Sequence, residues 1–155
     1  MLGFDFLLHG GILASLYIQP SPFLRPLEEA FALIPLGYAA FLTSAITLVW
    51  LAPHLQVRAP SQGFTFGLKL GALIWGGLAL GLASISTARP SLLAGWFVGQ
   101  TVELAIGGFV VGSALSGSSL RSLAMKVLAF VLLAAIITIA LQSLGLAPAA
   151  RIISR

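Results

Sequence analysis

The stretch Trp96–Ser113, WFVGQTVELAIGGFVVGS, decides the fold that we predict for this chain. It holds the only carboxyl group that falls deep inside a long apolar segment, that of Glu103. Residues four apart lie on one face of a helix. A nearly straight ridge is therefore expected from Gly95, Gly99, Glu103 and Gly107. Because glycines let a neighbouring helix come close, we predict that this is the central, most tightly packed helix of a membrane bundle.

A carboxyl group at this depth should face protein or a water-filled cavity, because lipid cannot solvate it. Gln100 lies one turn away on nearly the same face. We expect a neutral Glu103 that hydrogen-bonds to Gln100 or to a serine or threonine of a neighbouring helix. One alternative is an ion, proton or solute path that uses Glu103 with Gln100 and Thr101. Another is a site for a partner subunit or a lipid.

The composition excludes several classes of protein. Of the 155 residues, 59% are hydrophobic and only 8% are charged, whereas soluble domains carry about 25% charged residues. So few charges cannot cover a water-exposed surface, and we expect the lipid bilayer to solvate much of the chain. The net charge of +4 is spread over the loops, which argues against nucleic-acid binding. The absence of cysteine removes disulfides and thiolate metal sites.

The expected fold class is all-α, an integral membrane helical bundle of five transmembrane helices in one domain, 1–155. The spans are expected at about 4–19, 31–52, 64–86, 91–115 and 123–146. The first segment is short for a crossing, which needs about 20 residues. The alternative architecture has four spanning helices and a short, partly inserted first helix.

Prolines interrupt the chain between the first two apolar segments, and Pro26 suits the first turn of a new helix. Arg25 can pair there with Glu28 or Glu29, which predicts a charge-neutralised elbow at the membrane interface. The third segment carries two small-xxx-small pairs, Gly67 with Gly71 and Gly77 with Gly81. Such pairs bring helix backbones together inside a chain or between chains.

Two further polar side chains lie within apolar segments. His9 is near the middle of the first segment, and Lys69 lies little more than one turn inside the third. Both can join Glu103 in one cluster if the three segments that carry them are neighbours. The alternatives are a buried, hydrogen-bonded histidine and a lysine that extends to the nearer interface. By depth, Asp5 is an equally plausible partner for Lys69.

Five motifs run in order along the chain: HGGILASLY, RPLEE, PLGY, GFTFGLKLG and WFVGQTVELAIGGFVVG. From about Leu8 to Ser113 this pattern resembles a family of small, uncharacterised bacterial polytopic membrane proteins. The resemblance implies a location in the bacterial inner (cytoplasmic) membrane, and residues 120–155 look like a span added to the pattern. The residues to which the resemblance points are His9, Arg25, Glu29, Trp96 and Glu103.

The favoured function is a non-catalytic one, an accessory or structural subunit that packs against itself as a homo-oligomer or against a larger membrane complex. The alternative is a small transporter or channel with a polar lining of Glu103, Gln100, Thr101 and His9. We expect no enzyme, because HExxH, GxSxG and phosphate-loop motifs are absent from the sequence. Two distant histidines make a poor metal site, so neither a metal nor a cofactor is expected.

Overall fold

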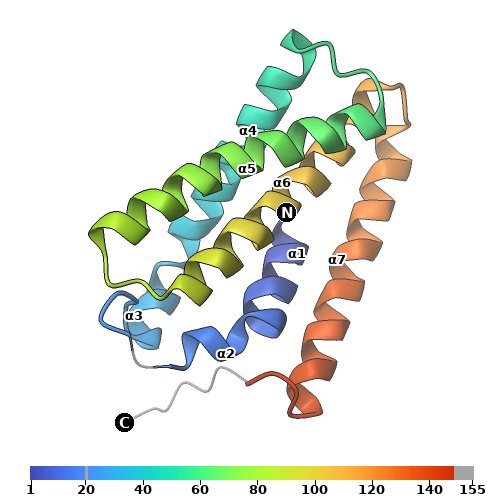
Figure 1. The fold of residues 1–155 in the computed structure, drawn as a ribbon. Coiled ribbons are helices and arrows are strands. Elements are labelled where there is room, and N and C mark those ends of the chain that lie inside the picture. The colour runs from blue at the N-terminus through green and yellow to red at the C-terminus, as the bar shows by residue number, and fades with distance from the viewer. Residues whose placement is uncertain (20, 149–155) are drawn as a thin grey trace.

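The computed structural model describes residues 1–19 and 21–148, with the backbone alone at 27 and 28, and its regular elements are all helical (Figure 1). Four helices are long and apolar enough to cross a membrane. They are α4 (Ile34–His54), α5 (Pro60–Ile85), α6 (Pro90–Leu115) and α7 (Leu120–Ser143). The all-helical class is therefore confirmed, and the number of helices that could span is four.

The N-terminal segment is divided into short pieces, so the five-span count is not confirmed. They are α1 (Leu2–Leu7), the π-helical turn η1 (Leu8–Ile12) and α2 (Ala14–Tyr17). The π-turn is closed by a hydrogen bond of 2.7 Å from the Leu13 amide to the Leu8 carbonyl. Gly10 and Gly11 lie within this turn, and π-turns in helices are frequent at functional sites.

The long helices differ from the predicted segments mainly at their starts. Helix α5 begins at Pro60 and not near residue 64, because proline fits the first turn, where its missing N–H is not needed. The predicted segment 31–52 is interrupted at Leu33. The short helix α3 (Leu27–Ala32) precedes this break, and α4 with Pro35 in its first turn follows it.

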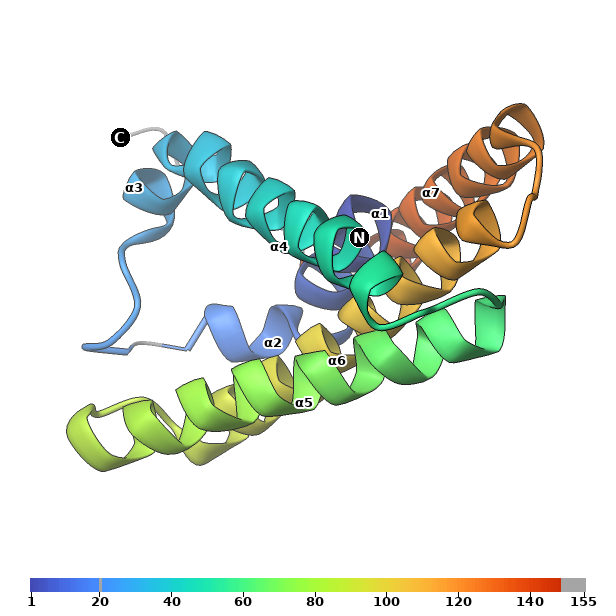
Figure 2. The same ribbon diagram turned by 90° about the horizontal axis from the view of Figure 1, so that it is seen from above.

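Helices α5 and α6 lie side by side along their length (Figures 1 and 2). Their backbones are in direct contact because small residues of α5 face α6. A Cβ added at Gly71 would lie 2.8 Å from the Cα of Thr101, closer than such atoms normally approach. The facing pairs are Gly63 with Gly108, Gly67 with Leu104, and Gly71 with Thr101. This contact leaves no room for side chains on that face of α5.

The predicted glycine ridge of α6 faces other elements than α5. The glycines of this ridge are Gly95, Gly99 and Gly107. A Cβ added at Gly95 would meet Leu13 of the N-terminal segment, and one added at Gly99 would meet Leu8. A Cβ added at Gly107 would meet Leu48 of α4. The second predicted pair of α5 is different again. No atom lies within 4 Å of a Cβ built at Gly77 or Gly81, so this pair packs against no described part of its own chain, and packing against another chain stays a prediction.

Helix α6 is the centre of the bundle, as its ridge of small and polar residues predicts. Half of its most apolar 18-residue window is buried, against 6%, 6% and 11% in α4, α5 and α7. Helix α7 holds the other side of the N-terminal segment, where Gly3 lies against Val131. There the Gln142 amide donates a hydrogen bond of 2.8 Å to the Gly10 carbonyl. The N-terminal segment is thus enclosed between α6 and α7.

Gly67→Leu is expected to lower the thermal stability of the purified protein, because the added side chain meets the Leu104 carbonyl of α6. Overpacking of this kind costs about 1–3 kcal/mol or more. The matched control is Gly37→Leu, at a position of α4 with open space around it, and it should leave the melting temperature unchanged. The measurement is a thermal melt of both variants in one detergent, and equal losses would contradict the packing described here.

Candidate functional site

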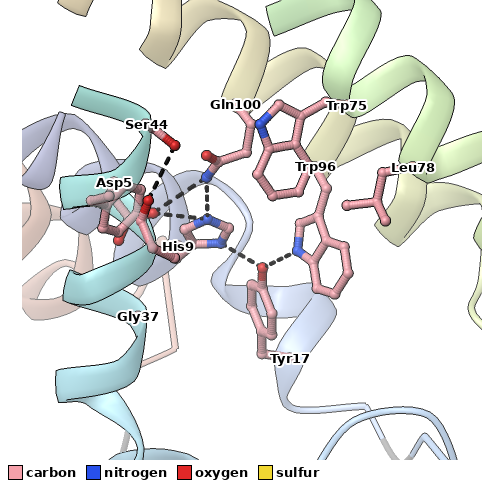
Figure 3. Close-up of a pocket in the computed structure, with 11 residues that line it drawn as sticks. Asp5, His9, Tyr17, Gly37, Ser44, Trp75, Leu78, Trp96 and Gln100 are labelled. Carbon is pink, nitrogen blue, oxygen red and sulfur yellow. Dashed lines mark hydrogen bonds and ion pairs between the residues drawn. The ribbon is translucent and has the colours of Figure 1, made fainter. Parts of the chain in front are cut away.

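A network of polar side chains connects the N-terminal segment to α6 (Figure 3). The first three members come from α1, η1 and α2, and the other two are one turn apart on α6. The members are Asp5, His9, Tyr17, Trp96 and Gln100. Gln100 is 5% exposed, and the side chains of Asp5 and His9 are 23% and 26% exposed. The network is therefore largely shielded from the surroundings of the protein.

The distances set a consistent direction for the hydrogen bonds from α6 to the carboxylate. The Trp96 Nε1–H donates to Tyr17 Oη at 2.5 Å, and Oη lies 2.5 Å from His9 Nδ1. His9 Nε2 lies 3.1 Å from Asp5 Oδ1. A neutral histidine with its proton on Nε2 fits these three contacts, because Tyr17 then donates to Nδ1 and Nε2–H donates to Asp5. The contact between Gln100 Nε2 and His9 Nε2 is then an approach of two donors and not a hydrogen bond.

Gln100 supplies a second donor to the same carboxylate oxygen. Its Nε2 lies 3.4 Å from Asp5 Oδ1 and 3.2 Å from His9 Nε2. With the histidine proton on Nε2, both N–H groups converge on Oδ1 of Asp5, which accepts them together. The arrangement holds one carboxylate by two neutral donors.

Local helix geometry explains why these residues meet. Asp5 and His9 are four residues apart on the α1–η1 segment, and Trp96 and Gln100 are four apart on α6, so each pair shares one helix face. The glycines beside them allow the two faces to approach, since a Cβ at Gly99 would collide with the Leu8 side chain. The close approach brings the two polar pairs within hydrogen-bonding distance.

The network borders a cavity of about 420 Å³ between the N-terminal segment, α4, α5 and α6. We call this cavity the Asp5 pocket. Its walls are mostly apolar and aromatic, and Figure 3 shows the side chains around it. It is lined by Asp5, His9, Tyr17, Gly37, Ala40, Phe41, Ser44, Trp75, Leu78, Trp96 and Gln100. Both its size and its apolar wall with a few convergent polar groups are typical of small-molecule sites.

A second cavity, of about 550 Å³, lies on the α7 side of the same network. It is bordered by Gln142 of α7 and by Ile18 near the end of α2. His9 and Tyr17 line both cavities. The hydrogen-bonded pair of these two side chains therefore forms part of the wall between the cavities.

The structure places Glu103 outside the network. Its side chain is completely buried in α6 and is not among the residues of the Asp5 pocket. Neither of its carboxyl oxygens has a hydrogen-bond partner among the described residues, and the same holds for the Thr101 hydroxyl. No hydrogen bond of standard geometry joins Gln100 to Glu103 among the described residues, although the two side chains are close enough to interact. The Gln100 amide nitrogen lies 3.4 Å from Asp5 Oδ1 and 3.2 Å from His9 Nε2 of the N-terminal segment.

Of the predicted intramembrane cluster, only His9 and Gln100 come together. Lys69 is exposed and lines a different cavity, of about 590 Å³, with Gln56 and Gln62 near the start of α5. Asp5, considered as a partner for Lys69, pairs with His9 instead. Lys69 thus lies outside the cluster, and its extension to the nearer membrane interface stays a prediction.

The predicted elbow before α3 contains an ion pair of 3.3 Å between Arg25 and Glu29. Both side chains are more than half exposed, at 65% and 57%, and such exposed pairs contribute little to stability. The side chain of Glu28 lies outside the described part of the structure. The elbow therefore contains a local, exposed ion pair, whereas the polar network at α6 is largely buried.

Sequence reasoning missed Asp5 and Tyr17 as members of the site and Trp75 as part of its wall. The spacing of Asp5 and His9 was a usable signal, since an acid and a histidine four residues apart on a helix can interact. Tyr17 is eight residues from His9, and the π-turn between them changes the helical register, so its contact has no simple sequence signature.

No protein-family model, no curated protein and no solved structure matches this chain.

Tyr17→Phe is expected to destabilise the protein, because it leaves the Trp96 Nε1–H and the His9 Nδ1 without their common partner. Loss of a shared partner in a shielded site costs about 1–3 kcal/mol. The chain has only two tyrosines, and Tyr38→Phe is the control because Tyr38 is 56% exposed. Thermal melts of both variants should show a lower midpoint for Tyr17→Phe alone. An unchanged midpoint would mean that the three side chains do not interact.

Proposed function

We propose that this protein is an integral membrane protein that binds a small solute in the Asp5 pocket, as a small transporter does. The membrane location is supported by four helices long and apolar enough to cross a bilayer. We place it in a bacterial inner membrane on the resemblance that covers about Leu8–Ser113.

The observation that carries the proposal is the polar network on the wall of an apolar cavity. Polar and ionisable groups are costly within a bilayer and mark substrate or ion pathways when they occur there. Asp5, His9 and Gln100 contact one another and border about 420 Å³ of space. A role in packing alone gives no reason for a cavity beside these groups, whereas solute binding requires one.

The proposed polar path differs from the one that the sequence suggested, because it runs along the Asp5 pocket and not along Glu103. Glu103 and Thr101 are sealed between helices, while His9 and Gln100 keep their role as lining. The second cavity supports passage beyond simple binding, because it adjoins the first across the His9–Tyr17 pair.

Single cysteines can test whether water reaches the Asp5 pocket within the membrane, because the chain has no cysteine of its own. Ser44 lines the pocket, and its hydroxyl donates a hydrogen bond to the Ala40 carbonyl of its own helix. In proteoliposomes, Ser44→Cys is expected to react with a small, water-soluble methanethiosulfonate reagent. The readout is the mass of the labelled protein.

The matched control is Thr43→Cys, the neighbouring position at the same depth of α4, which is exposed on the outer surface of the bundle. It should react much more slowly, because lipid covers that face and thiolates form poorly there. Fast labelling of Thr43→Cys would contradict membrane insertion of α4. Failure of both positions to react would contradict a water-filled solute site.

A second function, a subunit that associates with itself or with a larger complex, is favoured by a separate observation. Gly77 and Gly81 form a small-xxx-small pair on α5 that faces open space. The residues around it, such as Leu73 and Leu80, are 76% exposed. In lipid such a pair is suited to close packing against a helix of another chain.

This association should be lost in Gly77→Leu, because the side chain fills the space that a partner helix would need. Size-exclusion chromatography with light scattering in a mild detergent measures the mass of the assembly. Gly37→Leu is the control, since Gly37 on α4 also has open space around it. A monomeric wild-type protein, or an assembly that Gly77→Leu leaves intact, would contradict self-association through this face.

A further inference from the structure

We propose that the solute bound in the Asp5 pocket is an organic cation, an ammonium group carried on an apolar or aromatic body. The inference rests on the solute-binding function proposed above and specifies the chemical class of its ligand. It rests on three features of the pocket: the carboxylate of Asp5, the aromatic side chains of the wall, and the absence of lysine and arginine from the described lining residues.

The carboxylate of Asp5 is only partly satisfied by the protein. Both N–H donors, from His9 and Gln100, contact the same oxygen, Oδ1. The other oxygen, Oδ2, has no hydrogen bond or ion pair within residues 1–19 and 21–148. With His9 neutral, the site retains one negative charge and one free acceptor oxygen at the edge of the cavity.

The remaining lining suits a cation and disfavours an anion. No lysine or arginine is among the described residues that border the pocket. An anionic ligand would therefore meet Asp5 without a compensating charge. A cation, in contrast, pairs with the carboxylate in a shielded place where the attraction is stronger than in water.

Aromatic side chains form much of the opposite wall. Trp75 of α5 and Trp96 of α6 lie across the pocket from Asp5 (Figure 3). Phe41 of α4 is a third aromatic residue of the lining. Indole faces attract ammonium groups through the ring quadrupole, by about 0.5–2 kcal/mol. Trp96 is held in place by its bond to Tyr17 and by Phe23, whose ring centroid is 6.0 Å away. Aromatic rings together with a carboxylate are an arrangement that suits quaternary ammonium ligands.

The test compares ligands of one shape and different charge. Phenyltrimethylammonium, its neutral isostere tert-butylbenzene and the anion benzenesulfonate are titrated by calorimetry into the protein in lipid nanodiscs, with empty nanodiscs as the blank for partitioning. The expected result is saturable binding of the cation alone. Asp5→Asn should weaken this binding on the order of tenfold or more, as expected for a charge pair in a shielded site.

One variant is a control for the removal of an acid, and a second variant tests the aromatic wall. Glu29→Gln removes an exposed acid at the elbow and should leave cation binding unchanged. Trp75→Leu should weaken binding of the cation, and a thermal melt of each variant verifies that it is folded. Equal cation affinity in Asp5→Asn and the wild-type protein would overturn the assignment of the charge to Asp5.

The outcomes separate this inference from the function on which it rests. Binding of tert-butylbenzene or benzenesulfonate as tight as that of the cation, with labelling of Ser44→Cys, would overturn the cation class and leave a solute pocket in place. No binding of any probe, together with no labelling of Ser44→Cys, would overturn both. Labelling of Ser44→Cys without any binding of the cation overturns the present inference alone.

Discussion

The close backbone contact between α5 and α6 is the constraint on which the rest of the structure depends. Gly63, Gly67 and Gly71 bring α5 so near to α6 that no side chain fits between them. In a bilayer, where lipid gives no hydrophobic drive for helix association, such contacts replace the burial that stabilises soluble bundles. They also commit one face of α6 to α5, so the polar residues of α6 must find their partners on its other faces.

The N-terminal segment supplies those partners because it is short and irregular. It lies between α6 and α7, where Asp5 and His9 reach Gln100. Its π-turn leaves a carbonyl, that of Gly10, which Gln142 of α7 satisfies. A regular spanning helix would offer fewer free backbone groups and no break at which a cavity can form. The irregularity of this segment and the existence of the pocket are therefore two consequences of one arrangement.

The sequence predicts the long helices well, because their apolar length and their flanking prolines act locally. It also predicts α6 as the central helix, since a row of glycines beside polar residues has no stable place against lipid. It fails where spatial neighbours decide. The sequence does not say which element packs against the ridge at Gly99, and in the structure it is the Leu8 side chain of the N-terminal segment. The sequence likewise does not show that Gln100 contacts Asp5 and His9, because this depends on which segment lies nearest to α6 in space.

The two carboxyl groups of the bundle interior show why burial alone does not identify a site. Glu103 is the more deeply buried, with no exposed surface, and neither of its oxygens has a partner among the described residues. Asp5 is 23% exposed, holds two donors and borders the pocket. A ligand can approach only the second group, whereas the first can respond only through a change in helix packing. Access to the pocket and an incompletely hydrogen-bonded carboxylate are the reasons why we propose Asp5, and not Glu103, as the acid that contacts a ligand.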